Sequence, residues 1–156
     1  MPNSGDVFIY KQFTFEDGNQ RDKWFVVLNT SDSEKPCIAL KTTSKGNRYQ
    51  GCAKGCNKNH KCFFTPTTWQ TCFTVDTYIQ LPQIFEFSTI DLLKGGFAGR
   101  IEFQSPLTND CLAQLKTCLA GFKDDIAPLH WALIFKNQNA YRLTAVSRDE
   151  KQEEEK

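Results

Sequence analysis

The chain has 156 residues, of which 40% are hydrophobic and 24% charged, with a net charge of +1. This length is typical of one domain, and the composition supplies enough apolar side chains for a core, which excludes a largely disordered chain. No stretch approaches the roughly 18 apolar residues needed to cross a bilayer, and residues 1–5 are too polar for a secretory signal. We therefore expect a cytoplasmic protein without a membrane partner.

Strand patterns dominate the first part of the chain. Residues 7–13 alternate apolar and polar side chains, and residues 24–28 form a continuous apolar run typical of a strand buried on both faces. The turn sequence at residues 16–19, which includes Asp17 and Gly18, lies between them and predicts a hairpin. Further strands are expected at residues 37–40, 62–64, 78–81 and 99–103.

Two helices are expected after these strands. Ser88, with Asp91 three residues later, predicts the cap of a short helix. Thr108 predicts the cap of a longer one. Its apolar face would be formed by Leu112, Leu115, Leu119 and Phe122. The apolar runs at residues 130–135 and 141–146 have no decisive period, so they are left untyped.

The predicted organisation is one mainly β domain over residues 1–146. Residues 43–61 lack apolar periodicity and contain several glycines, lysines and cysteines, so we expect a long, exposed, basic, cysteine-rich loop. Residues 147–156 are charged and contain no apolar side chain, which predicts a disordered tail.

Charge is distributed unevenly along this domain. Residues 1–34 carry three basic and six acidic side chains, residues 35–75 carry seven basic and none acidic, and residues 76–156 carry nine basic and twelve acidic. The net charges of these segments are therefore −3, +7 and −3. The acid-free middle segment favours an anionic partner, with nucleic acid first and an acidic protein segment as the alternative.

The basic side chains near the expected loop are the candidate nucleic-acid ligands: Lys41, Lys45, Arg48, Lys54, Lys58 and Lys61. Lysine and arginine neutralise phosphates, and exposed aromatic rings stack on bases. Tyr49 and Trp69 are the candidate stacking rings. The alternative is a solvated loop whose lysines contact nothing.

Several short motifs resemble the MazF/PemK-like toxin family. They are Gly5-Asp6-Val7-Phe8, the apolar strand that begins with Lys23-Trp24, the stretch at residues 38–44 that ends in Thr42-Thr43-Ser44, and residues 73–79. The two helices follow in the family's order, so the resemblance covers roughly residues 5–122. It implies an SH3-like β-barrel with a short inserted helix and a C-terminal helix, usually in a homodimer.

The resemblance also implies an endoribonuclease that cuts single-stranded RNA without a metal and is silenced by an antitoxin protein. The resemblance places Lys23 where the family has its catalytic arginine, and Thr43, or alternatively Thr42, where it has a threonine. Arg21 is a candidate substitute for the arginine. The chain departs from the family pattern because Lys23-Trp24 replaces an Arg-Pro pair and Phe85 stands where many members have arginine. Lysine keeps the charge but does not clamp a phosphate through two bonds as arginine does. A non-catalytic nucleic-acid-binding or protein-interaction module on the same barrel therefore stays open.

The cysteines allow several interpretations. The seven cysteines are an odd number, so a full disulfide framework is not expected. Four potential zinc ligands are grouped in the sequence: Cys52, Cys56, His60 and Cys62. Zinc binding, a disulfide or redox role, and inert thiols all remain open for this group, and zinc would be the only cofactor. The other four cysteines are expected in or near the core: Cys37, Cys72, Cys111 and Cys118.

Overall fold

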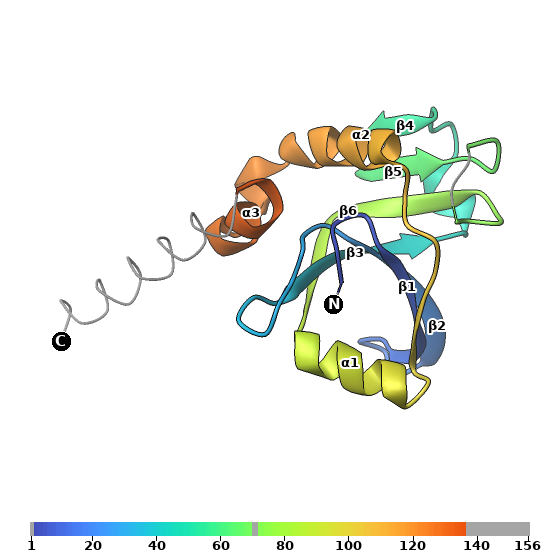
Figure 1. The fold of residues 1–156 in the computed structure, drawn as a ribbon. Helices are drawn as coiled ribbons and strands as arrows, with labels where there is room; N and C mark the ends of the chain where they lie inside the picture. The colour runs from blue at the N-terminus through green and yellow to red at the C-terminus, as the bar shows by residue number, and fades with distance from the viewer. Residues whose placement is uncertain (1, 70–71, 137–156) are drawn as a thin grey trace.

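The computed structural model describes residues 2–69 and 72–136, which form one seven-stranded antiparallel sheet and three α-helices (Figure 1). The hydrogen-bonded order of the strands is β4-β5-β6-β3-β2-β1-β7. Their bounds are Val7–Thr14 (β1), Gln20–Val27 (β2), Cys37–Thr43 (β3), Gly55–Asn57 (β4), Cys62–Thr65 (β5), Thr77–Phe87 (β6) and Ile101–Phe103 (β7). The mainly β prediction is confirmed. Within the described residues, β4 and β7 are sheet edges and do not pair with each other, so the sheet is not closed and the SH3-like barrel is not confirmed.

The predicted hairpin is formed by β1 and β2. Gly18 has a φ of 83°, a left-handed conformation that glycine adopts without strain. The carboxylate of Asp17 accepts a hydrogen bond from the backbone N–H of Asn19 at 2.9 Å, which closes the tip. A bulge in β1 between Tyr10 and Phe13 shifts the register with β2.

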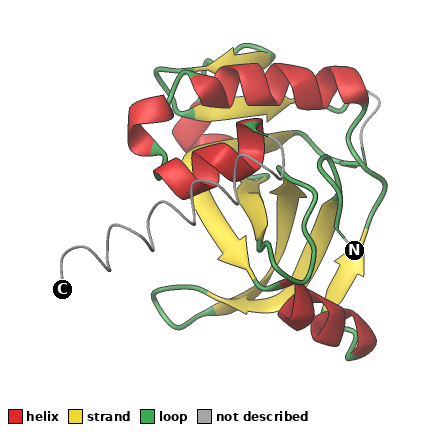
Figure 2. Ribbon diagram, turned by 60° about the vertical axis from the view of Figure 1, so that its left-hand side comes forward, coloured by secondary structure: helices red, strands yellow, loops and turns green. Residues whose placement is uncertain are grey.

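The sheet separates two apolar clusters. Along β2, Val26 belongs to the cluster that contacts α2 (Asn109–Ala120) and α3 (Pro128–Phe135), whereas Phe25 belongs to the cluster that contacts α1 (Thr89–Phe97). In Figure 2, α2 and α3 lie at one end of the sheet and α1 lies at the other. The apolar run at residues 24–28 is therefore buried on both faces, as its composition predicts.

Both predicted helix caps are present. The hydroxyl of Ser88 accepts a hydrogen bond from the N–H of Asp91 at 3.3 Å, and that of Thr108 accepts one from the N–H of Cys111 at 3.2 Å. In α2, Leu115 and Leu119 are buried as expected, while Leu112 is only half-buried. Cys111 and Cys118 complete the buried face in its place.

The sequence pattern does not predict whether residues 130–135 form a helix or a strand; in the structure they lie in α3. Pro128 begins this helix, where its missing N–H would have had no helical partner in any case. Residues 141–146 and the expected tail at 147–156 lie outside the described residues. Within the described part, no helix is both long and apolar enough to span a bilayer.

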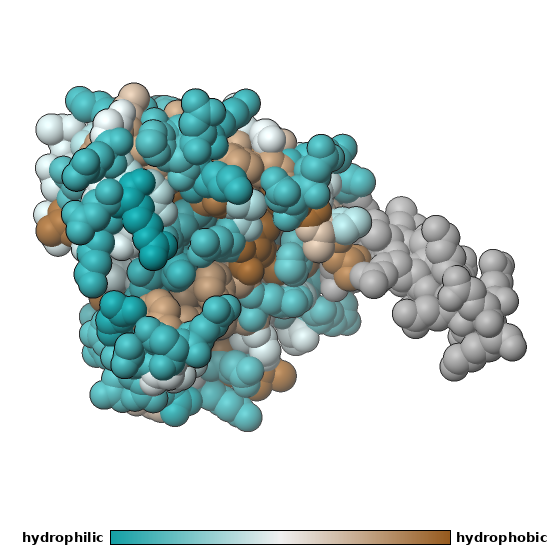
Figure 3. Space-filling model, turned by 180° about the vertical axis from the view of Figure 1, so that it is seen from behind, coloured by the Kyte–Doolittle hydropathy of each residue, from teal (hydrophilic) through white to brown (hydrophobic). Residues whose placement is uncertain are grey.

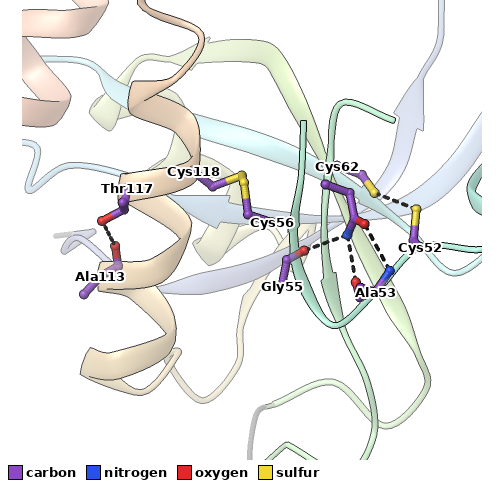
Figure 4. Close-up of a disulfide and its surroundings, with 9 residues drawn as sticks. Cys52, Ala53, Gly55, Cys56, Cys62, Ala113, Thr117 and Cys118 are labelled. Carbon is purple, nitrogen blue, oxygen red and sulfur yellow. Dashed lines mark hydrogen bonds between the residues drawn. A yellow bond between two sulfur atoms is a disulfide. The ribbon is translucent and has the colours of Figure 1, made fainter. Parts of the chain in front are cut away.

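The expected loop at residues 43–61 has more structure than the sequence predicts. It contains a 3₁₀ helix, η1 (Gly46–Tyr49), and the edge strand β4. A disulfide joins Cys56 of β4 to Cys118 of α2 across a sequence separation of 62 residues. Figure 4 shows this bond between the strand and the helix, with the sulfurs of Cys52 and Cys62 directed toward each other on the other side of β4 from α2. Most of residues 43–61 are exposed, as expected for this loop, and the disulfide holds the segment against α2, which the sequence did not predict.

Candidate functional site: a cationic pocket

A pocket of about 580 Å³ opens where β2 and β3 stop pairing. The final β2–β3 pair is Phe25 with Lys41, and beyond it the two strands diverge. Residues 73–75, from the connection that precedes β6, also line the pocket. The complete lining is Phe15, Arg21, Asp22, Lys23, Trp24, Lys41, Thr42, Thr43, Ser44, Lys45, Asn47, Arg48, Phe73, Thr74, Val75, Thr77 and Gln80.

Five of these residues are cationic: Arg21 and Lys23 of β2, Lys41 of β3, and Lys45 and Arg48 of the segment that follows β3. Among the described residues, none of the five forms a salt bridge. Asp22 is the one acidic side chain in the lining, and its Oδ1 accepts a hydrogen bond from the N–H of Gln12 at 3.0 Å. The pocket therefore has an excess of positive charge that its own residues do not neutralise.

Phe15, at the start of the hairpin tip, organises three of these cations. The guanidinium carbon of Arg21 lies 4.6 Å from the centre of the Phe15 ring, and the Nζ atoms of Lys23 and Lys41 each lie 5.7 Å from it. Cations are attracted to the electron-rich face of an aromatic ring. This ring therefore holds like charges from β2 and β3 close together.

The crowding of these charges is visible at Lys23. Burial of its half-buried side chain, with the positive charges of Lys41, Arg21 and Lys45, lowers the pKa of Lys23 to about 8. Burial, followed by the charge of Arg48, also lowers the pKa of Lys41. An anion in the pocket would relieve both effects, because opposite charge favours the protonated form of each amine.

Two threonine hydroxyls shape the end of β3. Thr42 donates a hydrogen bond to the carbonyl of Trp24 at 3.1 Å, which joins β3 to β2 at the point where they diverge. Thr43 accepts one from the N–H of Lys45 at 3.2 Å, which begins the turn into η1. Both threonines line the pocket, so the candidate Thr43 lies beside the candidate cations.

The 3₁₀ helix that carries Arg48 is anchored by its neighbour Tyr49. The Tyr49 ring is 7% exposed and stacks on Tyr78 with ring centres 5.0 Å apart. Its hydroxyl accepts a hydrogen bond from Nε2 of Gln80 at 3.1 Å. Tyr49 is therefore not an exposed stacking ring, which corrects the sequence expectation. Trp69 is half-buried and packs on Phe63, with ring centres 6.0 Å apart.

The structure brings together six of the sequence candidates and leaves three apart. Lining the pocket are Arg21, Lys23, Lys41, Thr43, Lys45 and Arg48. Outside it are Lys54, Lys58 and Lys61. Lys58 lies against α2, because a Cβ atom at Gly121 would be 2.9 Å from its Cε. Lys35 also belongs to the acid-free segment, but it is 3% exposed and its Nζ forms a salt bridge with Oδ2 of Asp32 at 3.5 Å.

The four potential zinc ligands do not form one site. The sulfur of Cys56 is bonded to Cys118, so it is not available as a thiolate. The sulfurs of Cys52 and Cys62 lie 3.6 Å apart, and His60 is exposed. Across residues 2–69 and 72–136, no group of three or more histidine, cysteine or acidic side chains could hold a metal ion. The disulfide interpretation holds for Cys56, although its partner is a cysteine that the sequence assigns to the core.

Sequence reasoning missed the uncharged part of the lining, notably Phe15, Phe73 and Gln80. Phe15 follows a predicted strand and precedes a predicted turn, and no local pattern directs its ring toward β3. The Phe73 ring packs on Trp24, with centres 5.8 Å apart. The charge pattern indicated one side of the pocket, but nothing in the sequence indicated its aromatic and amide side.

Comparison with known proteins does not assign the chain to a family. No family model matches the chain, and no curated protein matches it significantly. The resemblance to the MazF/PemK-like toxins therefore stays a prediction, and the functional argument depends on the pocket itself.

Proposed function

We propose that the protein binds single-stranded RNA in the cationic pocket. The observation that carries this proposal is the set of five cations that line one pocket without salt-bridge partners in the described part of the chain. Lysine and arginine side chains neutralise phosphates and supply most of the affinity for a nucleic-acid backbone. The half-buried ring of Trp24 in the same lining adds an aromatic surface on which an unpaired base can stack.

A single strand fits this site better than a duplex. The pocket has the volume of a small-molecule site, which suits one nucleotide with its base turned inward. In a duplex the bases are paired and stacked, so only the backbone would reach the lining. RNA rather than DNA is the expectation that comes from the family resemblance.

The binding test compares two neutralising substitutions by fluorescence anisotropy with a labelled, unstructured RNA. Lys23→Gln removes a pocket cation, and we expect the affinity to fall about tenfold or more. Lys94→Gln is the matched control, because Lys94 is exposed on α1 and does not line the pocket. Its affinity should equal that of the wild type.

Salt dependence gives the same test a second readout. For single strands, the slope of log affinity against log salt changes by about 0.7 for each phosphate contact. The Lys23→Gln protein should lose about one such contact, whereas the Lys94→Gln protein should keep the wild-type slope. Equal affinities for all three proteins, or no binding of RNA by the wild type, would refute the proposal.

Cleavage of the bound RNA is a second candidate function, and the lowered pKa of Lys23 favours it. The pKa of Lys23 is about 8 in the empty pocket, so a fraction of this amine is neutral near pH 7 and can take up the proton of a ribose 2′-hydroxyl. The bound phosphate raises this pKa and makes the neutral fraction smaller. The 2′ oxygen then bonds to phosphorus and the bond from phosphorus to the 5′ oxygen breaks. A 2′,3′-cyclic phosphate forms, and the leaving 5′ oxygen takes a proton from water. Arg21 and Lys41 would stabilise the negative charge that develops on the phosphoryl oxygens.

Incubation of the full chain with RNA in the presence of EDTA tests this step. Fragments that end in a cyclic phosphate are expected from the wild type and not from Lys23→Ala. Intact RNA together with a salt-sensitive gel shift would eliminate cleavage and leave binding as the function.

A further inference from the structure

Two free thiols face each other beside β4. The sulfurs of Cys52 and Cys62 lie 3.6 Å apart, and Figure 4 shows them directed toward each other. Both belong to the five cysteines that are not in the disulfide. A disulfide bond is about 2.05 Å long, so the two sulfurs would have to approach by only about 1.6 Å to form one. This pair is therefore a candidate site of thiol oxidation.

The fold holds both sulfurs in place. Cys62 is fully buried in β5, opposite Asn57 of β4 and Gln80 of β6. The side chain of Asn57 also holds the residue after Cys52. Its Oδ1 accepts a hydrogen bond from the N–H of Ala53 at 3.0 Å, and its Nδ2 donates one to the carbonyl of Ala53 at 2.7 Å. Groups that are held in contact in this way react at an effective concentration far above that of a dissolved thiol.

The backbone around Cys52 allows the remaining approach. Residues 50–54 belong to no helix or strand, and most of them are exposed. The N–H of Cys52 donates a hydrogen bond to the carbonyl of Tyr49 at 3.2 Å, which is part of a turn. A small shift of this segment therefore breaks no strand pairing and no helical hydrogen bond.

The two thiols differ in their access to solvent. Cys52 is half-buried, whereas Cys62 is fully buried. Burial, followed by the hydrogen bond and charge of the Cys52 sulfur, raises the pKa of the Cys62 thiol to about 12, so this thiol is protonated at neutral pH. A dissolved oxidant is therefore expected to react with Cys52 first, and Cys62 to react second from within the fold.

We infer that Cys52 and Cys62 form a reversible disulfide when the protein meets a low-molecular-weight disulfide such as oxidised glutathione. The thiolate of Cys52 attacks one sulfur of the oxidant, whose S–S bond breaks and releases one glutathione thiol. The Cys62 thiol then loses its proton and attacks the Cys52 sulfur in the mixed disulfide, which releases the second glutathione thiol. The two cysteine sulfurs together lose two electrons and two protons, and the two glutathione thiols take them up. The new bond would fasten the segment after η1, the 3₁₀ helix that carries Arg48, to β5.

Mass spectrometry of the full chain tests this site. After denaturation, N-ethylmaleimide should label five thiols in the untreated protein. After excess oxidised glutathione it should label three, because the new bond consumes two. In a tryptic digest without reductant, residues 49–54, which contain Cys52, should be linked to residues 62–94, which contain Cys62. Residues 62–94 also contain Cys72, so Cys72→Ser is the matched control and should give the same link.

Two further substitutions separate the roles of the two thiols. Cys62→Ser should keep one glutathione on Cys52, because the second step has no thiol. Cys52→Ser should attach no glutathione to Cys62, because that thiol is buried. The digest of the wild type needs no substitution, so the inference can be tested even if Cys62→Ser fails to fold.

Three results would overturn the inference. They are five labelled thiols after treatment, a stable glutathione adduct on Cys52 of the wild type, and a link from Cys52 to Cys72 in place of Cys62. None of these measurements involves RNA, so the inference and the proposed function stand or fail separately.

Discussion

Lys23 shows how a single residue's chemistry depends on neighbours that are distant in sequence. Its pKa is lowered first by burial and then by Lys41, Arg21 and Lys45, which come from two strands and a connecting segment. An exposed lysine keeps its charge to well above pH 9, whereas this one changes charge close to neutral pH. Any activity that uses the charge of Lys23 should therefore depend on pH.

RNA binding is expected to weaken as the pH rises from about 7 to about 9. Lys23 is mostly protonated below its pKa of about 8 and loses its charge above it, so one phosphate contact is lost over this range. Anisotropy titrations at a constant salt concentration measure the change.

Lys23→Arg is the control for this pH dependence. A guanidinium stays charged throughout the range, so the variant should bind RNA with a flatter pH profile. A remaining slope at the higher pH values is expected from Lys41, whose pKa is also lowered. Identical profiles for the wild type and Lys23→Arg would exclude Lys23 as the titrating group.

At the scale of elements, α1 approaches the edge strand β7 through a glycine. A Cβ atom at Gly95 would lie 2.5 Å from Cγ1 of Ile101, and Gly95 is buried. At the next residue, Gly96, a Cβ atom would have nothing within 4 Å. The close packing of α1 on β7 therefore requires a glycine at position 95 but not at position 96, although both lie in the same turn of the helix.

This difference can be measured with two alanine substitutions. Gly95→Ala forces α1 away from Ile101, and overpacking of this kind should lower the free energy of unfolding by about 1–3 kcal/mol. Gly96→Ala adds a better helix former without a clash, and should raise it by about 0.5 kcal/mol. Urea denaturation followed by circular dichroism gives both values. A stabilising Gly95→Ala would show that α1 and β7 are not this close.

At the scale of the whole molecule, the cationic pocket is one part of a surface that carries both hydrophilic and hydrophobic side chains (Figure 3). Figure 3 shows a face on which hydrophilic side chains predominate and hydrophobic ones gather in a hollow. The overall charge of +1 gives no sign of the pocket, because all the acidic residues lie in the first and last segments of the chain and offset the basic ones in the sum. Local excess charge, rather than net charge, determines how the molecule would attract an RNA strand.

The disulfide between Cys56 and Cys118 is expected to stabilise the whole fold. It closes a sequence separation of 62 residues, and the chain-entropy account assigns a loop of this length about 4 kcal/mol. Reduction of the wild type should therefore lower its melting temperature by roughly 10 °C.

The control for this prediction is Cys56→Ser/Cys118→Ser. It should melt at the temperature of the reduced wild type, and a reductant should not change it further. A wild type whose melting temperature does not respond to a reductant would show that the bond contributes nothing to stability.

Local features of the fold follow directly from the sequence. Ser88 and Thr108 cap helices as expected, and Gly18 closes the predicted hairpin. These predictions succeed because caps, turns and the alternation of apolar side chains depend on residues within a few positions of one another.

The apolar patterns also predicted a mainly β protein, and the charge pattern indicated the side of the pocket formed by Lys41, Lys45 and Arg48 but not the side formed by Arg21 and Lys23. Only the tertiary structure decided which cations share a pocket. Lys23 and Arg48 line the same pocket because β2 and β3 diverge and because Tyr49 anchors η1, whereas Lys54 and Lys58 lie outside it. The same holds for the bond between Cys56 and Cys118, two cysteines that no sequence spacing connects. Such contacts depend on strand order and helix packing, which join distant segments and leave no local periodic pattern in the sequence.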